Sequence, residues 1–194
     1  MNRVLKATVL FFILTGITWQ AVAFSEADLQ KLKSSLKCPD CNLSGVDLSG
    51  AKLAGANLAY ANLDKARFFR AELAGSKLTK AVLTEADLFS ADLTGADLSG
   101  ANLIDAYMED ANLRDADLTG ADLSKAYLET TDLTGANLTQ ANLTGAFLER
   151  TNLENTDLTD AVLNDAKLNW VKNLDKAVLC RTTMPDATVD NSGC

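Results

Sequence analysis

The most reactive spacing in the chain is Cys38-Pro39-Asp40-Cys41, in which two thiols are separated by two residues. Such a pair forms either a thiol–disulfide redox couple or a structural bridge. No neighbouring base and no strand–helix–strand pattern accompanies it, which favours the structural bridge and leaves the redox couple as the alternative. The other cysteines are Cys180 and Cys194. Of the three pairings that four cysteines allow, we expect Cys38–Cys41 with Cys180–Cys194; a zinc site built from all four thiolates is an alternative.

Other catalytic chemistry finds little support in the sequence. The 194 residues include no histidine, which excludes His-dependent nucleophiles and His-ligated metal sites. A phosphate-binding loop, a zinc signature and a nucleophile elbow are also missing from the sequence. The 26 Asp and Glu residues recur throughout the chain, so spacing singles out no carboxylate pair. We therefore expect a protein that is not an enzyme and needs no cofactor or metal.

Residues 1–23 have the pattern of a secretory signal peptide. Arg3 and Lys6 precede a mostly apolar run from Ala7 to Ile17, and Ala21-Val22-Ala23 offers a cleavage site between small residues. The apolar run is shorter than the roughly 20 residues that a membrane-spanning helix needs. We expect cleavage after Ala23, no membrane span afterwards, and a location in the periplasm or outside the cell, or in the thylakoid lumen if the source is a cyanobacterium. Such compartments favour disulfides.

A five-residue period occupies most of the remaining chain. From Leu43 to Leu168 every fifth residue is Leu at 24 of 26 positions, with Phe68 and Met108 as the exceptions, and the residue two places earlier is Ala at 20 of the 26. In a helix, at about 100° per residue, a step of five would scatter these leucines around the axis. In an extended chain, residues two apart share a face. We therefore expect Ala and Leu to point inward and the Asp or Asn between them to point outward. The next two residues are turn formers.

The run ADLTGADLSGANL, residues 91–103, resembles the pentapeptide repeat family. The resemblance implies an all-β fold, a right-handed quadrilateral parallel β-helix in which four five-residue sides make one 20-residue coil. The 26 repeat units would then form about 6.5 coils of this solenoid. The terminal segments that carry the cysteines also look like those flanking the repeat in exported bacterial members.

Both ends of such a stack need caps, because open hydrogen-bonding edges promote end-to-end association. The segment from Ser25 to Leu36 predicts a short amphipathic helix with leucines along one side. Near the other end, the leucine period slips by one residue between Leu168 and Leu174. We therefore expect an N-terminal helical cap at residues 24–40, the β-helix at residues 41–170, and a C-terminal cap or tail with a disulfide at residues 171–194.

One side of the predicted coil gathers most of the aromatic residues of the repeat. We call a set of residues 20 apart a column, because neighbouring coils would place them side by side. The candidate interaction face comprises two columns: Tyr107, Tyr127 and Phe147 in one, and Phe69, Phe89, Glu109, Glu129 and Glu149 in the other. Stacked like residues contribute about 0.2–1 kcal/mol per pair, which gives a purely structural interpretation. Exposed aromatic patches also mark contact surfaces, and stacked glutamates are unfavourable unless a cation or a basic partner neutralises them.

These patterns together predict a non-catalytic exported scaffold or protein–protein interaction module. Its expected partner is another protein or a second copy of the chain, and no nucleic acid is expected. One alternative is a DNA-mimicking inhibitor of a topoisomerase such as gyrase, by analogy with gyrase-protecting members of the family, because the chain is acidic with a net charge of −8. The other alternative is a redox protein that uses Cys38 and Cys41.

Overall fold

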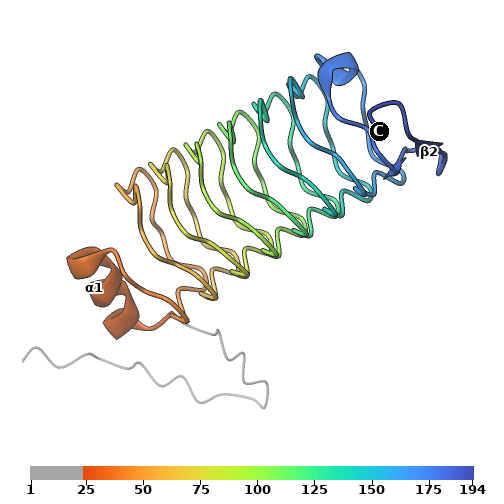
Figure 1. The fold of residues 1–194 in the computed structure, drawn as a ribbon. Helices are drawn as coiled ribbons and strands as arrows, with labels where there is room; N and C mark the ends of the chain where they lie inside the picture. Colours follow the sequence, from red (N-terminus) through yellow and green to blue (C-terminus); the bar gives the residue numbers. More distant parts are fainter. Residues whose placement is uncertain (1–23) are drawn as a thin grey trace, which may run out of the picture.

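The computed structural model describes residues 24–194, which form a short helix followed by a stack of coils (Figure 1). The predicted signal peptide lies outside the described residues. The elements are helix α1 (Glu26–Ser35), the 3-10 helix η1 (Leu174–Lys176), and strands β1 (Thr182–Thr183) and β2 (Val189–Asp190). Within residues 24–194, no helix is long and apolar enough to cross a membrane.

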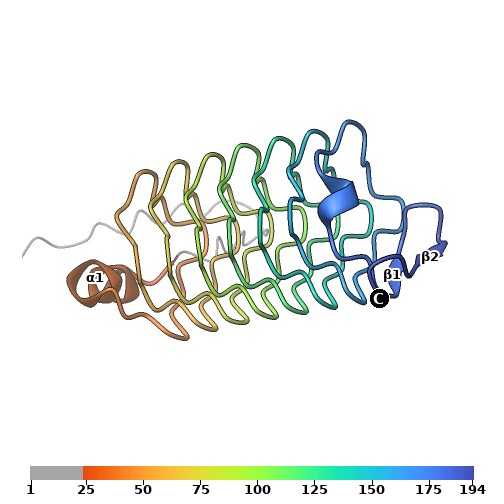
Figure 2. The same ribbon diagram turned by 45° about the horizontal axis from the view of Figure 1, so that its top comes forward.

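Parallel bridges between residues 20 apart hold the coils together. They run from Lys37–Asn57 to Asn152–Lys172 and recur every five residues, so each coil has four bridged positions. On one side of the stack, the amide of Leu88 donates to the carbonyl of Tyr107 with an N···O distance of 2.7 Å, and the amide of Tyr107 donates to the carbonyl of Ala86 at 2.9 Å. Successive coils therefore lie side by side along one axis, as Figure 2 shows.

Each coil turns at four corners of two residues, and the sequence supplies two devices for the turn. The outward Asp or Asn accepts a hydrogen bond from the amide two residues later: Asp97 Oδ1 accepts from the amide of Ser99 at 3.0 Å. The second corner residue has a left-handed backbone, with φ of 61° at Gly95 and 59° at Thr130. Glycine adopts this conformation without strain, whereas a β-branched residue such as threonine does so rarely.

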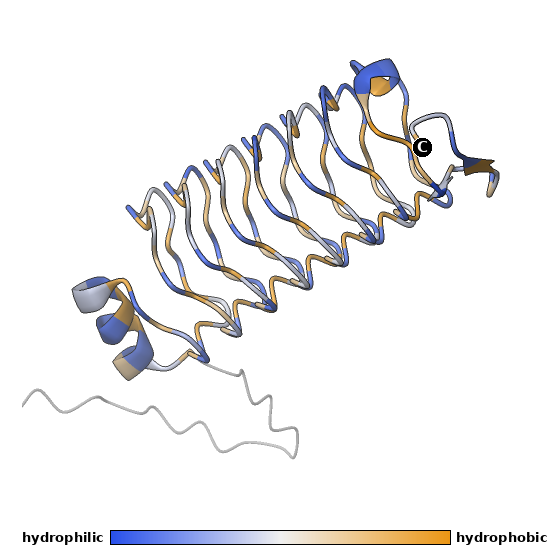
Figure 3. Cartoon of the chain, viewed as in Figure 1, coloured by the Kyte–Doolittle hydropathy of each residue, from blue (hydrophilic) through white to orange (hydrophobic). Residues whose placement is uncertain are grey.

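The interior consists of the inward leucines and alanines. Leu93, Leu98 and Ala96 are fully buried, and Phe68 and Met108 are buried in the leucine positions that they occupy. Figure 3 shows hydrophobic and hydrophilic residues alternating along the sides of the coils. This alternation follows from the extended backbone, in which successive side chains point to opposite faces.

Helix α1 caps the first coil. The Ser25 hydroxyl accepts a hydrogen bond from the amide of Asp28 at 3.2 Å, which begins the helix. Leu29 and Leu32 are buried, and Asp28 Oδ2 accepts from the amide of Asn42 at 2.9 Å, which ties the helix to the coil. The helix lies within the segment from Ser25 to Leu36 for which the sequence predicts one.

The coil extends further at both ends than the predicted boundaries of 41 and 170. Bridging begins at Lys37 and continues after Lys172, where the spacing grows to 21 residues in Asp157–Val178 and Val162–Thr183. The extra residue is absorbed around η1, so the chain returns to the stack instead of leaving it at Trp170. Strand β1, whose Thr183 is bridged to Val162, then pairs antiparallel with β2 at the C-terminal end of the stack.

Candidate interaction face

The candidate interaction face comprises one side of the stack and the corner that follows this side. The outward residues of the side form the side column, and the first residues of the corner form the corner column. The side column contains Arg67, Asp87, Tyr107, Tyr127 and Phe147, and the corner column contains Phe69, Phe89, Glu109, Glu129 and Glu149. The columns lie two positions apart within each coil, with one inward residue between them, so their side chains project from the same outer surface.

The aromatic residues of both columns stack as the sequence predicts. Ring centroids lie 5.1 Å apart in Tyr107–Tyr127 and 4.9 Å apart in Tyr127–Phe147, with the planes within 8° and 6° of parallel. In the corner column, Phe69 and Phe89 stack at 5.8 Å. Tyr107 is 43% exposed because it is the first ring of its ladder. The stacking is thus confirmed, and it leaves a ring edge and a terminal ring face open to solvent.

The three glutamates of the corner column stack on one another, and one oxygen of each carboxylate lacks a hydrogen-bond donor within the described residues. One carboxylate oxygen, Oε2, of each of Glu109, Glu129 and Glu149 is buried and has no hydrogen-bond partner among the residues that the structure describes. Partial burial raises the pKa of the central Glu129, and the flanking carboxylates raise it further, which outweighs a backbone hydrogen bond that lowers it. The corner column therefore presents carboxylates that a cation or a basic group would stabilise.

A groove of about 520 Å³ opens on this face where the two ladders end. It is lined by Lys65, Arg67, Phe69, Glu85, Asp87, Phe89, Tyr107 and Glu109. Arg67 and Asp87 lie on the flat side of the coil, between the corner that carries Lys65 and Glu85 and the corner that carries the phenylalanines. Tyr107 lines the groove as the first aromatic residue of the side column.

Sequence reasoning missed this groove, although its signal is present. The side column changes from Asp87 to Tyr107 at the same coil where the corner column changes from Phe89 to Glu109. The sequence predicts the rings and the glutamates of the two columns, but not the charged lining residues beside them, which are Lys65, Arg67, Glu85 and Asp87.

The sequence profile of pentapeptide repeats matches the chain in eight copies, over residues 41–72, 66–103, 96–135 and 136–172. The chain belongs to the pentapeptide repeat family. This membership implies the right-handed β-helix that the resemblance in the sequence predicts. No match was found among curated protein sequences.

Two solved structures place this pentapeptide repeat protein among its relatives. One is HetL, a pentapeptide repeat protein involved in heterocyst differentiation regulation from the cyanobacterium Nostoc sp. strain PCC 7120; it is 33% identical, with a TM-score of 0.58 over 79% of this chain and 78% of HetL. The other is QnrB1, a plasmid-mediated fluoroquinolone resistance protein, which is 20% identical with a TM-score of 0.55 over 81% of this chain and 86% of QnrB1. The likeness to QnrB1 shows a shared fold only.

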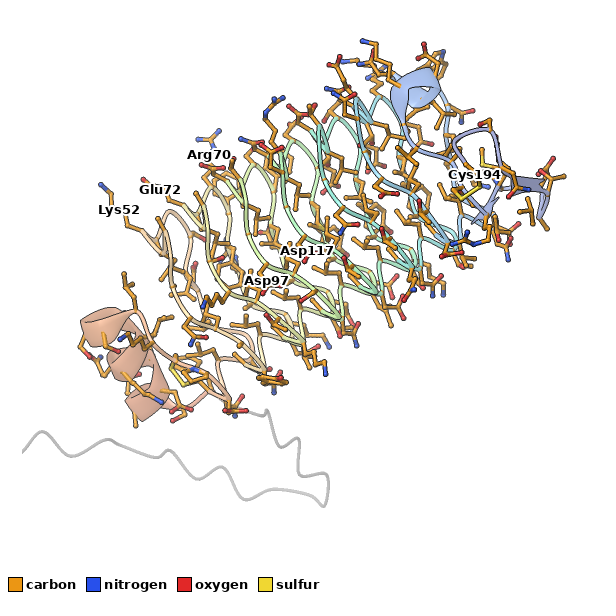
Figure 4. All side chains as sticks on the ribbon, viewed as in Figure 1. Lys52, Arg70, Glu72, Asp97, Asp117 and Cys194 are labelled. Atoms are coloured by element: carbon orange, nitrogen blue, oxygen red, sulfur yellow. A yellow bond between two sulfur atoms is a disulfide. The ribbon has the colours of Figure 1, made fainter. Side chains whose placement is uncertain are left out.

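The cysteines of this pentapeptide repeat protein form two separate disulfides, Cys38–Cys41 and Cys180–Cys194, which is the pairing that the sequence favours. They lie at opposite ends of the stack, one beside α1 and the other at the C-terminal end where Figure 4 labels Cys194. The predicted alternative of one zinc site with all four thiolates is therefore wrong, because the rod separates the two pairs.

The buried position of the first disulfide bears on the redox alternative. Cys38 is fully buried and Cys41 is 3% exposed, and the sulfur and carboxylate atoms of Cys38, Cys41 and Asp28 lie within 4.8 Å of one another. Lys31 Nζ lies 3.9 Å from Cys41 Sγ. These charged neighbours would interact electrostatically with a thiolate. Thiol–disulfide exchange also requires that an attacking thiolate reach a sulfur atom. Burial under α1 therefore favours the structural role.

Proposed function

We propose that this pentapeptide repeat protein is an exported, non-catalytic scaffold that binds a protein partner through the candidate interaction face. The observation that carries the proposal is the coincidence of a ladder of stacked rings, of which Tyr107 is exposed and the other two are partly buried, with three stacked carboxylates that form no ion pair in the described part of the chain. A purely structural ladder explains the rings but leaves the stacked glutamates uncompensated. Contact with a partner accounts for both features.

Two further observations support a binding role without catalysis. HetL, which shares 33% identity with this chain, is involved in heterocyst differentiation regulation. The carboxylates of the other sides have local structural partners: Asp97 Oδ1 accepts from the hydroxyl of Ser99 at 2.6 Å, and Asp117 Oδ1 accepts from that of Thr119 at 2.5 Å. Asp97 and Asp117 occupy neighbouring coils in Figure 4. Because such residues build the turns, the acidic sides need no mimicry of DNA to explain them.

The binding role is tested by affinity capture combined with chemical cross-linking. The variant Tyr107→Ser/Tyr127→Ser/Phe147→Ser removes the ladder, and Tyr60→Ser/Val82→Ser removes two exposed apolar residues from other sides as a control. We expect the ladder variant to lose a partner, or its own dimer, that the wild type and the control retain, with all three proteins giving the same circular dichroism spectrum. Identical partners and oligomeric state for all three would refute the proposal.

Export is tested separately by fractionating cells that express the chain and measuring the mass of the purified protein. A periplasmic or extracellular protein that begins at Phe24 is expected. A cytoplasmic protein that retains residues 1–23 would contradict export, and would make the topoisomerase-inhibitor alternative the better one.

A further inference from the structure

We propose that the groove at Asp87 and Tyr107 binds the guanidinium group of an arginine that a basic, extended segment of the partner presents. This inference rests on the proposed function, because it specifies the chemistry of the partner. It is carried by one juxtaposition: the free ends of two aromatic ladders meet two carboxylates that form no ion pair within residues 24–194, in a single groove of about 520 Å³. That volume lies within the range of about 300–1,000 Å³ that is common for ligand sites.

The ends of the ladders supply flat apolar surfaces. Tyr107 stacks on Tyr127 through one ring face, and the preceding residue of the side column is Asp87, so the other face of Tyr107 borders the groove. Phe89 likewise stacks on Phe69 and is followed in the corner column by Glu109. A planar cation binds well against such ring faces.

The charges of the groove leave an anionic surplus near Tyr107. The two cations that line it are already ion-paired, Lys65 with Glu85 at 3.5 Å and Arg67 with Asp47 at 3.2 Å. Asp87 and Glu109 form no ion pair within residues 24–194. Asp87 Oδ1 accepts from the amide of Phe89 at 3.2 Å, which holds this carboxylate in place. A guanidinium group can bond two carboxylates through its several N–H donors while its plane stacks on a ring.

The chain itself uses this chemistry at the neighbouring ring. The guanidinium carbon of Arg70 lies 5.0 Å from the centroid of the Phe69 ring. At Phe89 and Tyr107, the structure provides rings of the same kind together with carboxylates, and among the described residues no cation lies over either ring. An arginine from a partner would complete the same arrangement.

An extended segment fits better than a free small cation, because the acidic column continues beyond the groove. Glu129 and Glu149 follow Glu109 on successive coils, about 4.8 Å apart, and form no ion pair within the described residues. One oxygen of each carboxylate is buried, so a second basic residue of the same segment would pair with the other oxygen. The net charge of −8 would also steer a basic segment toward the protein.

The test uses fluorescence anisotropy with a labelled seven-residue peptide of alternating glycine and arginine. Its control peptide carries citrulline, which has the shape of arginine without the charge. The protein variants are Asp87→Asn/Glu109→Gln at the groove and Asp115→Asn/Glu72→Gln away from it, which remove the same number of charges. Asparagine occupies the same outward position between Ala and Leu at residue 102 and makes the same turn bond, since Asn102 Oδ1 accepts from the amide of Ile104 at 3.2 Å.

We expect the arginine peptide to bind the wild type and the control variant equally, and the groove variant roughly tenfold more weakly or worse, with no binding of the citrulline peptide. Equal binding to both variants, or no binding to the wild type, would overturn the inference. Nα-acetylarginine amide is the third probe. If it binds as tightly as the peptide, the groove serves a free guanidinium compound and the docking of a segment is wrong.

The two proposals fail in distinguishable ways. If the ladder variant loses its cellular partner while peptide binding ignores Asp87 and Glu109, the interaction face stands and the arginine groove is rejected. If the peptide binds through the groove while the ladder variant, which lacks Tyr107, keeps all its partners, the groove binds arginine but is not the partner's docking site, and the interaction role of the Tyr107–Phe147 ladder is rejected.

Discussion

At the scale of single residues, the inward position that alanine normally fills shows that buried hydroxyl groups differ in whether they form a hydrogen bond. Thr131 and Thr151 occupy this position and donate their hydroxyls to the carbonyls of Met108 and Leu128, at 2.8 and 2.6 Å. Ser76 occupies it too, fully buried, but its Oγ has no hydrogen-bond partner in the described part of the chain. The same position thus carries satisfied and unsatisfied hydroxyls.

We therefore expect Ser76→Ala to stabilise the protein. The substitution removes a buried hydroxyl without a partner and leaves the commonest residue of the repeat, so the free energy of unfolding should rise by about 1 kcal/mol. Thr151→Ala is the matched control and should lower it, because a satisfied hydrogen bond and a methyl group are lost. Urea unfolding measures both changes. A fall in stability for Ser76→Ala would show that the hydroxyl has a partner, such as water, after all.

Glu129 predicts a dependence of stability on pH. Burial and the charges of Glu109 and Glu149 raise its pKa above the ordinary value of 4.5, so the folded protein binds this proton more tightly than the unfolded chain. The corresponding stability is fully present below pH 4.5 and is lost as the pH rises through the raised pKa. Glu129→Gln should therefore stabilise the protein at pH 7 and have little effect near pH 4.

Asp132 provides the opposite case for the same measurement. Partial burial raises the pKa of Asp132, but hydrogen bonds from Thr134 and the charge and hydrogen bond of Arg114 outweigh burial and lower it overall. Its contribution is present above the ordinary value of 3.8 and is lost as the pH falls through the lowered pKa. Asp132→Asn should thus destabilise the protein at pH 7. Thermal unfolding between pH 3 and 8 would contradict the assignment if both variants changed stability in the same direction.

At the scale of elements, the sequence predicts the coil because one period determines several features at once. Leu, Ala and the residue between them alternate as an extended chain requires, and the following two residues turn it. The sequence does not predict where the stack ends: whether the extra residue before Val178 breaks the coil or is absorbed depends on the turn at η1. The groove was missed for a related reason, since it arises between columns and not within one.

The regular packing of the coils predicts a large loss of stability when a leucine is removed from the middle of the stack. Leu113 is fully buried between coils that are fixed by bridges on every side, so Leu113→Ala should leave a cavity and lower the free energy of unfolding by about 2–5 kcal/mol. Leu174, in η1 at the end of the stack, is only partly buried and serves as the control. Denaturant unfolding should show the larger loss for Leu113→Ala. Equal losses at the two sites would mean that the middle of the stack relaxes as freely as its end.

At the scale of the whole molecule, each coil is stabilised by its contacts with the two neighbouring coils. Every bridge within the regular stack joins residues 20 apart, so a coil bonds only to the coil before it and the coil after it. Helix α1 and the Cys38–Cys41 disulfide close one end, and the β1–β2 pair and the Cys180–Cys194 disulfide close the other. In such a linear array, a defect at one end loosens the nearest coils first.

Cys180→Ser/Cys194→Ser is therefore expected to loosen one end and leave the other unchanged. The disulfide restrains the segment that contains β1, β2 and the loop between them, and the amide of Gly193 donates to the carbonyl of Leu179 at 2.9 Å beside it. Without the bridge, amide hydrogen exchange should rise over residues 157–194, which include the last two bridged pairs, and stay unchanged over residues 43–103. Cys38→Ser/Cys41→Ser should give the reverse pattern. A uniform rise along the whole chain in either variant would show that the coils open as one cooperative unit, which nearest-neighbour contacts alone do not produce.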